Sequence, residues 1–500
     1  MLLKDLLKGV GVQQLPSPLE EKRINDIKID HRQVQEGDVF IAFKGVNHNG
    51  NDYVLDAIKK GAVAIVSEED LPYENVVKVD NARAAYSLMS KHYFSDACDD
   101  MRIIAITGTN GKTTTANTIS SLLATAGARV GTIGTLGATF NGKNIDTGFT
   151  TPDPYQLHSL FEQMKREGQE FVVMEASAHA LALNKLDGIR FEIGVLTNIT
   201  EDHLDFFGDM DTYAKAKYKL FEKDRAKLGI VCGGKTYTNN PEEFSQIPII
   251  TYGIGEGFDV GGTNVKKSFN KSQFDCNYLG EEFPITTSLV GSYNIENALA
   301  SIAVCRSLGI DKSLIQLGMN CLTPVEGRFN VIKVNGQKVI IDFAHTPDGL
   351  EKVLMTAREL TNDKIVVVFG CGGNRDRKKR AIMGSIAQSL ADEVVLTSDN
   401  PRYEKPLDII EDIRKGMTVS PFIIPNRKQA VEYALKKFNQ GETIVIAGKG
   451  GEKYQDIGGR KYPYNDFDVV YNYFRKNIKM VKNSEKIQGN DAADDENDIN

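Results

Sequence analysis

The segment "TGTNGKTTT", at positions 107–115, constrains the fold of this chain more than any other feature of its sequence. It follows the apolar run 102–107, which reads as a strand, and it opens a segment with apolar residues at helical spacing: Ala116, Ile119, Leu122, Leu123 and Ala126. A glycine loop between a strand and a helix lets backbone amides approach a phosphate. We therefore predict a nucleotide site at Gly108, Thr109, Asn110, Gly111, Lys112, Thr113 and Thr114.

Two side chains of this loop carry the expected chemistry. Lys112 would neutralise the β- and γ-phosphates of a nucleotide, and the Thr113 hydroxyl would bind Mg²⁺. The general Walker pattern has a glycine five residues before Gly111, where this chain has Ile106. The flanking strand and helix favour nucleotide binding over a chance match, but the loop alone does not define the reaction.

The length of the chain, 500 residues, exceeds what one ordinary core holds, so several domains are expected. Short apolar runs fill residues 1–97, and strand, glycine-loop and helix patterns repeat through 98–328. Residues 329–480 alternate strands with helices, as in a mainly parallel sheet. Residues 481–500 carry five acidic residues among the last ten and are predicted to be a disordered acidic tail.

The composition excludes several classes of protein. Hydrophobic residues make up 41% of the chain and charged residues 25%, and the net charge of −7 without a long basic stripe argues against nucleic acid as a partner. No stretch approaches the roughly 18 uninterrupted apolar residues of a membrane span, and the N-terminus has no obvious cleavage site. The six cysteines include no CxxC pair, which argues against a zinc ribbon. We expect a cytoplasmic monomer with reduced thiols and no membrane insertion.

Two polar side chains follow predicted strands of the nucleotide-binding region. Glu175 ends the strand in "FVVMEASAH", and His203 follows the strand in "GVLTNITEDHLDFFGD". The ends of strands beside a phosphate loop are where metal ligands would lie, but a lone Glu or His is more often structural. At this point both interpretations stand.

The segment 211–221, "DTYAKAKYKLF", places one lysine on an apolar helical face. Lys215 and Lys219 are four residues apart and share a face, whereas Lys217 does not lie with them. Its helical neighbours are Tyr213, Ala214, Leu220 and Phe221. Spacing alone favours a lysine that buries its stem and keeps its ammonium in water. The alternative is a buried amine with a lowered pKa, which reacts with CO₂ to give an anionic carbamate that could hold a second Mg²⁺.

Eight motifs occur in one order along roughly residues 25–470: "TGTNGKTTT", "MEASAHAL", "TNITEDHLDFFGDMDTYAKAK", "GSYNIENALA", "DFAHTPDGLEKVL", "GCGGNRDRKKRAIMG", "DNPRYEKP" and "GKGGEKYQ". Together they resemble the Mur ligases of peptidoglycan synthesis, most closely the MurE type. That type adds the third residue to UDP-N-acetylmuramoyl-L-alanyl-D-glutamate. The resemblance implies an α/β protein of three domains: an N-terminal domain for the UDP-precursor, a central P-loop ATPase domain and a Rossmann-like C-terminal domain for the amino acid.

The resemblance also implies a metal site and a reaction. The lysine that matches Lys217 is carbamylated in this family, which favours the carbamate interpretation. The implied metal ligands are Thr113, Glu175, His203 and the carbamate of Lys217. Catalysis is expected to involve Lys112, Glu175, His203, Lys217 and His345. ATP would convert the precursor's D-glutamate carboxylate into an acyl phosphate, which a neutral amine then attacks, and domain closure would bring the reactants together.

The remaining implied site residues fall into three groups. Asn294 matches an adenine contact, and Arg328 and His345 match residues near the nucleotide at a domain junction. The expected contacts to the UDP-precursor are Ile29, His31, Thr150, Thr151, Ser177 and Lys185. The expected contacts to the amino acid are Arg375, Asp399, Asn400, Pro401, Arg402, Gly448 and Glu452.

Arg402, in "DNPRYEKP", bears on the identity of the amino acid. In the resembling family this arginine accompanies meso-diaminopimelate, and relatives that add lysine usually lack it. Diaminopimelate has a second carboxylate at its far end, which a guanidinium can hold through two parallel hydrogen bonds. The alternative is that Arg402 is an ordinary arginine of a surface loop.

Four positions depart from the family pattern. His31 stands where the family has serine, Leu183 where some members have glutamine, and Lys185 where many have arginine. Gly451 replaces the histidine of the usual GKGHE motif. The first three lie where the precursor should bind, so the amide-ligase chemistry is a firmer prediction than the precursor.

Several alternatives stay open at this stage. The chain could be a related ligase that uses L-lysine, another amino acid or a modified acyl acceptor, as folylpolyglutamate synthetase and cyanophycin synthetase are relatives with other substrates. It could also be a P-loop regulatory or binding module without ligase activity, although the set Glu175, His203 and Lys217 argues against that. An amidotransferase partner subunit is disfavoured because that relative uses a clustered-cysteine zinc ribbon. "TTPDP", at 150–154, favours the cell-wall enzyme.

Overall fold

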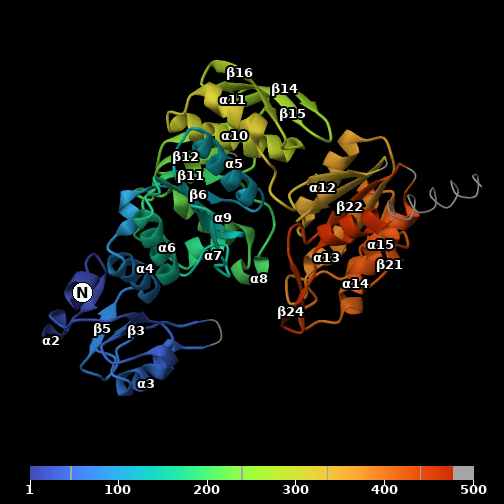
Figure 1. Cartoon of the computed structure of the whole chain (residues 1–500). Helices are drawn as coiled ribbons and strands as arrows, with labels where there is room; N and C mark the ends of the chain where they lie inside the picture. The colour runs from blue at the N-terminus through green and yellow to red at the C-terminus, as the bar shows by residue number, and fades with distance from the viewer. Residues whose placement is uncertain (46–47, 238–239, 335, 440, 477–500) are drawn as a thin grey trace, which may run out of the picture.

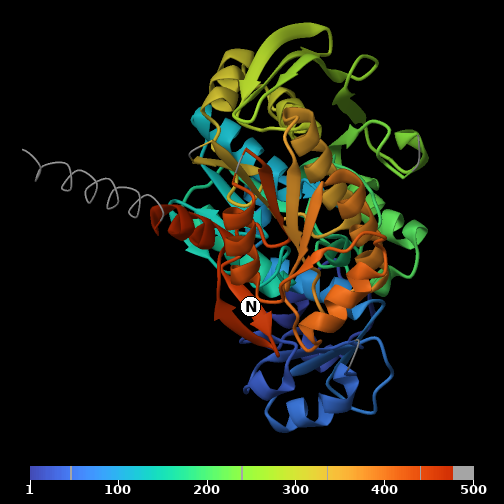
Figure 2. The same ribbon diagram turned by 90° about the vertical axis from the view of Figure 1, so that its right-hand side faces the viewer.

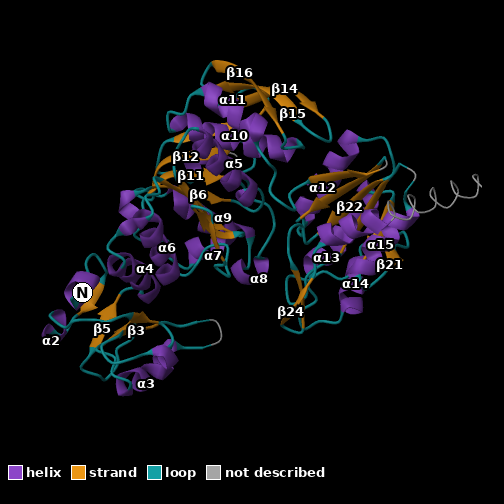
Figure 3. Cartoon of the chain, viewed as in Figure 1, coloured by secondary structure: helices purple, strands orange, loops and turns teal. Residues whose placement is uncertain are grey.

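The computed structural model describes residues 1–45, 48–237, 240–334, 336–439 and 441–476. In this part of the chain three main β-sheets form, each from a separate stretch of sequence, together with a two-stranded hairpin (Figure 1). Helices cover the sheets (Figure 3), so the α/β class and the three-part architecture expected from the sequence are confirmed. The predicted acidic tail, 481–500, lies outside the described residues.

The first sheet has the strand order β1-β5-β4-β3-β2 and is parallel except at β1, which runs antiparallel to β5. β3 and β4 are buried along their whole length because apolar clusters lie on both faces of the sheet. The elements of this stretch are α1 (Leu3–Leu6), β1 (Val12–Gln14), α2 (Ser17–Glu20), β2 (Ile27–Lys28), η1 (His31–Gln33), β3 (Val39–Ala42), η2 (Gly50–Tyr53), α3 (Val54–Lys59), β4 (Ala64–Ser67), β5 (Val76–Val79), α4 (Ala82–Tyr93) and η3 (Ala97–Asp100).

The central sheet has the order β16-β15-β14-β13-β12-β11-β6-β10-β7-β8-β9. The strands from β14 to β7 in this order are parallel, and antiparallel strands extend the sheet at both ends. The strands and helices up to β11 are β6 (Arg102–Thr107), α5 (Lys112–Thr125), β7 (Val130–Gly134), β8 (Gly137–Phe140), β9 (Lys143–Ile145), α6 (Pro154–Arg166), β10 (Phe171–Glu175), α7 (Ala178–Ala182) and β11 (Phe191–Leu196). Those that follow are α8 (Leu204–Phe207), α9 (Met210–Tyr218), η4 (Lys219–Phe221), β12 (Ala226–Cys232), η5 (Pro241–Glu243), β13 (Ile249–Ile254), β14 (Val260–Lys267), β15 (Ser272–Tyr278), β16 (Glu281–Thr287), α10 (Ser292–Ser307) and α11 (Lys312–Cys321).

The strand and the helix on either side of the phosphate loop pack in the core of the central sheet, which is why both left a clear apolar pattern in the sequence. β6 carries the predicted strand without a shift, and α5 buries Ala116, Ile119, Leu122 and Leu123 against one face of the sheet. The predicted stripe is one residue too long, because α5 ends at Thr125 and Ala126 is its half-buried C-cap. The opposite face packs against α6, α7 and α9.

The third sheet has the order β17-β18-β22-β19-β20-β21, parallel except for β17, which confirms the mainly parallel sheet expected there. Its elements are β17 (Asn330–Val334), β18 (Gln337–Asp342), α12 (Pro347–Leu360), β19 (Ile365–Phe369), α13 (Lys378–Leu390), β20 (Glu393–Leu396), α14 (Pro406–Arg414), β21 (Phe422–Ile423), α15 (Arg427–Lys437) and β22 (Thr443–Ala447). A hairpin of β23 (Tyr454–Ile457) and β24 (Arg460–Pro463) follows, and residues 466–476 are helical.

The third part lies against the central part, in front of it in the view of Figure 2. Asn110 of the phosphate loop donates a hydrogen bond to Asp348 at the start of α12 (2.7 Å). A second contact comes from the turn between β14 and β15, where the Phe269 ring lies 5.4 Å from Lys333 Nζ and 5.1 Å from Lys338 Nζ. No helix of the described residues has the length and hydropathy needed to cross a bilayer.

Candidate active site

Three neighbouring strands bring the predicted nucleotide-site residues to one edge of the central sheet. β6 leads into the phosphate loop, and β10 and β11 flank it on either side. Because all three are parallel, their carboxyl ends meet at the same edge, which places Glu175 and the loop carrying His203 beside the phosphate loop. A cavity of about 340 Å³ opens there, and its lining includes Lys112, Glu175, His203, Arg328 and His345.

The phosphate loop has a backbone that only glycine accommodates. Gly111, the N-cap of α5, has φ +90°, and a Cβ there would lie 2.5 Å from Asn297 Oδ1. A Cβ at Gly108 would lie 1.9 Å from Thr197 Oγ1. Lys112 Nζ donates to the carbonyl oxygens of Gly108 (2.9 Å) and Thr109 (3.0 Å). The lysine therefore folds over its own loop, and burial lowers its pKa while Glu175 opposes that shift.

Glu175 is buried and held from two sides. Its Oε1 accepts hydrogen bonds from the Thr113 hydroxyl (3.0 Å) and from the backbone amide of Thr135 (2.9 Å). Its Oε2 accepts a hydrogen bond from the Thr135 hydroxyl (3.2 Å). A Cβ at Gly134 would lie 2.4 Å from Oε1, so the turn after β7 wraps closely around the carboxylate. The predicted pair Thr113 and Glu175 is thus brought together with oxygen atoms of the kind that Mg²⁺ prefers.

His203 lies at the start of α8 with a left-handed backbone, φ +57°. Its Nε2 is 3.4 Å from Asp202 Oδ2, and the ring of His179 packs against it at 4.8 Å. Burial lowers the pKa of His203 to about 4, although Asp202 acts in the opposite direction. The imidazole is therefore neutral at physiological pH, which is the protonation state in which a histidine binds a metal.

Lys217 is buried to 1% exposure, so its ammonium does not reach water as a snorkelling lysine would require. Its Nζ lies 4.3 Å from the centre of the Tyr213 ring. Among the described residues no hydrogen bond or ion pair reaches this Nζ. Burial, together with the nearby Lys112 cation, lowers its pKa well below the usual value, and Asp202 only partly opposes this. These are the conditions under which an amine is neutral and nucleophilic.

The nucleotide cavity also contains the predicted Asn294 and Arg328. Asn294 on α10 donates to the carbonyl oxygen of Val290 (2.8 Å) and accepts from Asn297 (3.2 Å). The Arg328 guanidinium lies over the Phe343 ring at 4.4 Å, and its Nη2 approaches the Thr113 hydroxyl at 3.3 Å. His345 lines the same cavity and contacts the backbone oxygen of Phe343 through Nδ1 (3.0 Å).

A second cavity of about 270 Å³ adjoins the first and shares with it the wall formed by Asp202, His203, Phe343, His345 and Arg375. It collects most of the residues predicted for the amino acid: Arg375, Asp399, Asn400, Arg402, Gly448 and Glu452. Pro401 is not part of its lining. Asp399 Oδ2 is buried and has no hydrogen-bond partner in the described part of the chain, which leaves an acceptor at this cavity for a ligand. Arg402 Nη1 donates to the Gly373 carbonyl oxygen (2.8 Å).

The residues predicted for the UDP-precursor are only partly brought together. The Thr151 hydroxyl bonds the carbonyl oxygen of Glu175 (2.9 Å) and Ser177 Oγ (3.2 Å), and Thr150 contacts Thr135 (3.1 Å). Lys185 instead pairs with Asp153 (2.5 Å). Ile29 and His31 lie at the first sheet, where His31 stacks on Tyr53 at 4.2 Å. Within the described residues, neither Ile29 nor His31 contacts Thr151 or Ser177 through a hydrogen bond or an ion pair.

Several residues of these cavities escaped the sequence reasoning. Thr135, Asn297, Tyr293, Asp342 and Phe343 line the nucleotide cavity. The Tyr293 hydroxyl is buried without a hydrogen-bond partner in the described structure. Asp342 and Phe343 belong to "DFAHTP", two or three residues before the predicted His345, so the sequence could have placed them at the same site. Tyr293 and Asn297 belong to "GSYNIENALA", beside the predicted Asn294, so the same signal was available for them. Thr135 lies outside the eight motifs.

Comparison with protein families gives three matches along the chain. The Mur ligase family, catalytic domain, matches residues 23–96. The Mur ligase middle domain matches residues 106–305. The Mur ligase, glutamate ligase domain, matches residues 327–450. These matches cover most of the chain and follow the three sheets in order.

Curated relatives match over nearly the whole length. The UDP-N-acetylmuramoyl-L-alanyl-D-glutamate–2,6-diaminopimelate ligase of Clostridium perfringens is 40% identical over 482 residues, which cover 94% of this chain and 99% of the relative. The enzyme of the same name from Aquifex aeolicus is 38% identical and covers 90% of this chain and 93% of its own.

Solved structures agree with these relatives. A structure of a UDP-N-acetylmuramoyl-L-alanyl-D-glutamate–2,6-diaminopimelate ligase superposes with a TM-score of 0.68 at 30% identity and covers 93% of this chain and 97% of the other. A MurF ligase of Thermotoga maritima in complex with ADP (TM-score 0.59, 19% identity, 92% and 98% covered) shares the fold. The phosphate loop, the cavities at the strand ends, the family matches and the relatives lead to one conclusion: this chain belongs to the Mur ligase family.

Proposed function

We propose that this chain is the ATP-dependent ligase that joins meso-diaminopimelate to UDP-N-acetylmuramoyl-L-alanyl-D-glutamate in peptidoglycan precursor synthesis. The observation that carries the proposal is the shared wall between a cavity at the phosphate loop and a cavity lined by Asp399, Arg402 and Glu452. Relatives with this printed activity cover the chain almost end to end, which supports the same assignment.

ATP supplies the activation that a carboxylate needs before an amine can attack it. On nucleotide binding, Lys112 exchanges the two carbonyl oxygens it holds for phosphate oxygens, and the amides at the start of α5 face the same phosphates. The precursor's D-glutamate carboxylate attacks the γ-phosphorus, ADP leaves, and an acyl phosphate forms. Arg328, next to the Thr113 hydroxyl, adds positive charge on the side of the third sheet.

The residues around Glu175 fit a magnesium site. Thr113 and Glu175 supply oxygen ligands at contact distance from each other, and neutral His203 lies on the same cavity. Mg²⁺, when bound, offsets the charge of the triphosphate. Within the described residues no group of three or more His, Cys, Asp or Glu gathers as a metal site. The carbamate of buried Lys217, formed when its amine adds to CO₂ and releases one proton, would add an anionic oxygen ligand.

The amine step requires a neutral, oriented amino acid. Asp399 Oδ2 is an acceptor for the ammonium end of an amino acid, because it belongs to a residue that lines this cavity and lacks a hydrogen-bond partner in the described structure. Arg402 and Arg375 offer guanidinium groups to carboxylates in the same cavity. The free amine attacks the acyl carbon, the tetrahedral intermediate collapses to an amide, and inorganic phosphate leaves.

Three of the four departures from the family pattern concern the precursor. Lys185 provides a point charge in place of a planar guanidinium, and in this structure it is paired with Asp153. We expect Thr150, Thr151 and Ser177 to contact the peptide end of the precursor, and Ile29 and His31 its UDP end.

A ligation assay tests the proposal directly. Phosphate release is measured with ATP, the UDP-muramoyl dipeptide and either meso-diaminopimelate or L-lysine, and mass spectrometry identifies the product. We expect turnover with diaminopimelate and little with lysine, because Arg402 can pair with the second carboxylate. A preference for lysine would overturn the assignment of Arg402. Turnover only with another acyl acceptor would identify a related ligase of the same family.

A further inference from the structure

One buried lysine in the third part of the chain is not used by the chemistry above. Lys449 follows β22 in "GKGGE", between Gly448 and the start of the hairpin, and its side chain is 0% exposed. It lines neither the nucleotide cavity nor the amino-acid cavity. A buried ammonium costs free energy unless charged and polar groups surround it, so a reason for its presence must lie in its partners.

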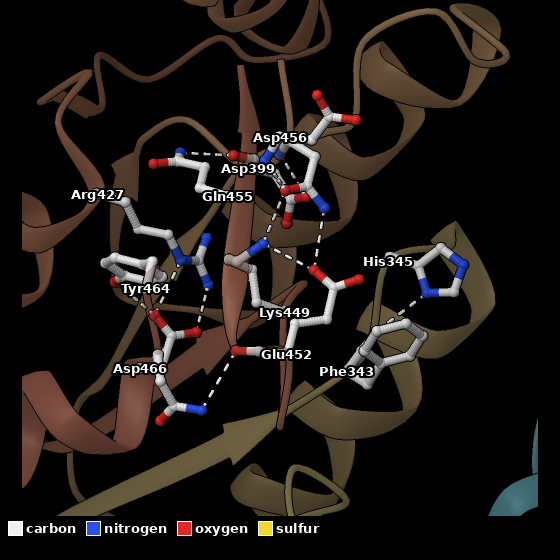
Figure 4. A network of polar contacts seen from close by, with 12 residues as sticks. Phe343, His345, Asp399, Arg427, Lys449, Glu452, Gln455, Asp456, Tyr464 and Asp466 are labelled. Carbon is white, nitrogen blue, oxygen red and sulfur yellow. Dashed lines mark hydrogen bonds and ion pairs between the residues drawn. The ribbon is translucent and has the colours of Figure 1, made fainter. Parts of the chain in front are cut away.

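The partners of Lys449 are two residues of the amino-acid cavity, and Figure 4 shows the contact with Glu452. Its Nζ donates to Glu452 Oε2 (2.7 Å) and to Asn400 Oδ1 (2.9 Å). Asn400 Nδ2 donates to the same Glu452 Oε2 (3.0 Å), which closes a triangle of hydrogen bonds. Asn400 Oδ1 also accepts from the backbone amide of Asp456 (2.9 Å), so the triangle is tied to the hairpin strand β23.

This triangle decides which atoms face the cavity. The hydrogen bonds from Lys449 and Asn400 to the Glu452 carboxylate both end on Oε2, which leaves Oε1 for a bound amino acid. Asn400 is the neighbour of Asp399, whose Oδ2 is buried without a partner. Lys449 therefore joins the loop after β20, which carries Asp399 and Arg402, to the loop after β22, which carries Gly448 and Glu452.

We propose that Lys449 is a positioning residue for the amino-acid substrate, which holds Glu452 and Asn400 so that the two loops present one fixed set of acceptors to the amine end of that substrate. The proposal rests on the function proposed above and adds to it a residue that acts without touching the substrate. A carboxylate held by an ammonium and an amide keeps its orientation before the substrate arrives, which lowers the entropy cost of binding.

Steady-state kinetics of Lys449→Met test the proposal, since methionine keeps the length of the side chain and removes the ammonium. We expect the KM for diaminopimelate to rise about tenfold or more, as is typical for the loss of a charged hydrogen bond. The KM for ATP should stay within about twofold, because Lys449 lies outside the nucleotide cavity. An unchanged KM for the amino acid in a folded variant would overturn the proposal.

A second variant covers the case in which methionine prevents folding. Lys449→Gln removes the charge but keeps a hydrogen-bond donor at the site, so a rise in KM of smaller size is expected. The double variant Lys449→Met/Glu452→Gln should bind the amino acid about as weakly as Glu452→Gln alone, because Lys449 acts through that carboxylate. Fully additive effects would contradict this.

A matched control separates positioning from stability. Arg427 and Asp466 form a fully buried ion pair (2.8 Å), and Arg427 Nη2 also bonds the carbonyl oxygen of Ala447 at the end of the same strand β22. Neither residue lines the amino-acid cavity. Asp466→Asn should lower the thermal unfolding midpoint and leave the KM for the amino acid unchanged. Lys449 variants that behave in the same way would show a purely structural role.

Turnover of the wild-type protein with diaminopimelate tests the proposed function separately from the role of Lys449. If diaminopimelate supports no turnover, the proposed substrate is wrong, and the KM comparison is made with the amino acid that does support it. If the wild-type protein uses diaminopimelate but the Lys449 variants lose stability without a change in KM, as the control does, the positioning proposal fails and the proposed function stands.

Discussion

At the scale of single residues, the surroundings of Lys217 set its chemistry. It lies on an apolar helical face, and its exposure of 1% rules out the snorkelling interpretation that spacing alone favoured. The partners of Glu175 are less visible in the sequence. Thr135 holds this carboxylate through a backbone amide and a hydroxyl, and a contact between a turn and a distant strand leaves no pattern in the sequence.

Replacement of Lys217 tests the carbamate. Lys217→Ala should reduce kcat by about 10²- to 10³-fold or more, because it removes an anion from beside the phosphates. Short-chain carboxylates such as acetate should restore part of the activity, and a ¹³C signal from labelled bicarbonate should appear in the wild-type protein only. Lys215→Ala, on the exposed face of α9, is the control and should keep its activity. Full activity in Lys217→Ala would eliminate the carbamate.

The burial of His158 should make the folding stability of the protein depend on pH. Its side chain is buried on α6, both ring nitrogens lack partners in the described structure, and burial lowers its pKa to about 3, with Lys91 and His92 acting in the same direction. The unfolded chain binds a proton near pH 6.5 and the folded chain does not, so stability is lost as the pH falls below about 6.5. Between pH 7 and pH 5 this one group should cost about 2 kcal/mol.

His158→Leu removes this titration. Its thermal unfolding midpoint should fall less than that of the wild-type protein when the pH is lowered from 7 to 5, as followed by circular dichroism. The comparison isolates His158 because other histidines with a lowered pKa, such as the half-buried His203, are present in both proteins. An identical pH dependence in the two proteins would show that His158 is protonated in the folded state.

At the scale of elements, the sequence predicted the parallel core and missed the strands added to it. β6, β10 and β11 are buried apolar runs bounded by glycine or polar residues, which is a strong local pattern. β15 and β16 alternate buried and exposed residues and are joined by the turn at Leu279 and Gly280, so they were readable as a hairpin. The order of strands in the sheet comes from tertiary packing and was beyond a local pattern.

The turn between β6 and α5 supports a prediction about glycine. Gly111→Ala forces a Cβ to 2.5 Å from Asn297 Oδ1 at φ +90°, so the loop must shift and the affinity for ATP should fall about tenfold or more. Gly127→Ala is the matched control, since Gly127 follows the same helix at φ +88° with nothing within 4 Å of the added Cβ. Calorimetric titration with ATP compares the two. Equal affinities would show that the loop tolerates the shift.

At the scale of the whole molecule, the function depends on contacts that no single part of the sequence contains. The nucleotide cavity is lined by the central part and by Asp342, Phe343 and His345 of the third part. The motifs that carry these residues are more than 200 positions from the phosphate loop, so only the family resemblance predicted that they meet. The placement of Ile29 and His31 relative to the central part was expected from the same resemblance and stays a prediction.

The contacts of Phe269 link the central part of the chain to the third part. Its ring packs between Lys333 and Lys338 of the third sheet, and Lys333 also donates to Asn270 (2.8 Å). Phe269→Ala should weaken this contact by about 1–2 kcal/mol and increase the radius of gyration measured by small-angle scattering without substrates. Leu279→Ala, at the exposed turn at the other end of β15, is the control and should leave the scattering unchanged. Unchanged scattering in Phe269→Ala would show that other contacts hold the parts together.

The adjacency of β10, β6 and β11 has a consequence for how such a protein can vary over evolution. Long stretches of chain leave this edge of the sheet and return to it, and the register of each strand, rather than the length of the excursion, fixes where its last residue lies. Insertions or deletions in the outer parts of these segments, away from the turns that carry Lys112, Thr135 and His203, would change the outer surface and leave the distances within the site intact. Surface loops can therefore diverge freely while the chemistry is inherited without alteration.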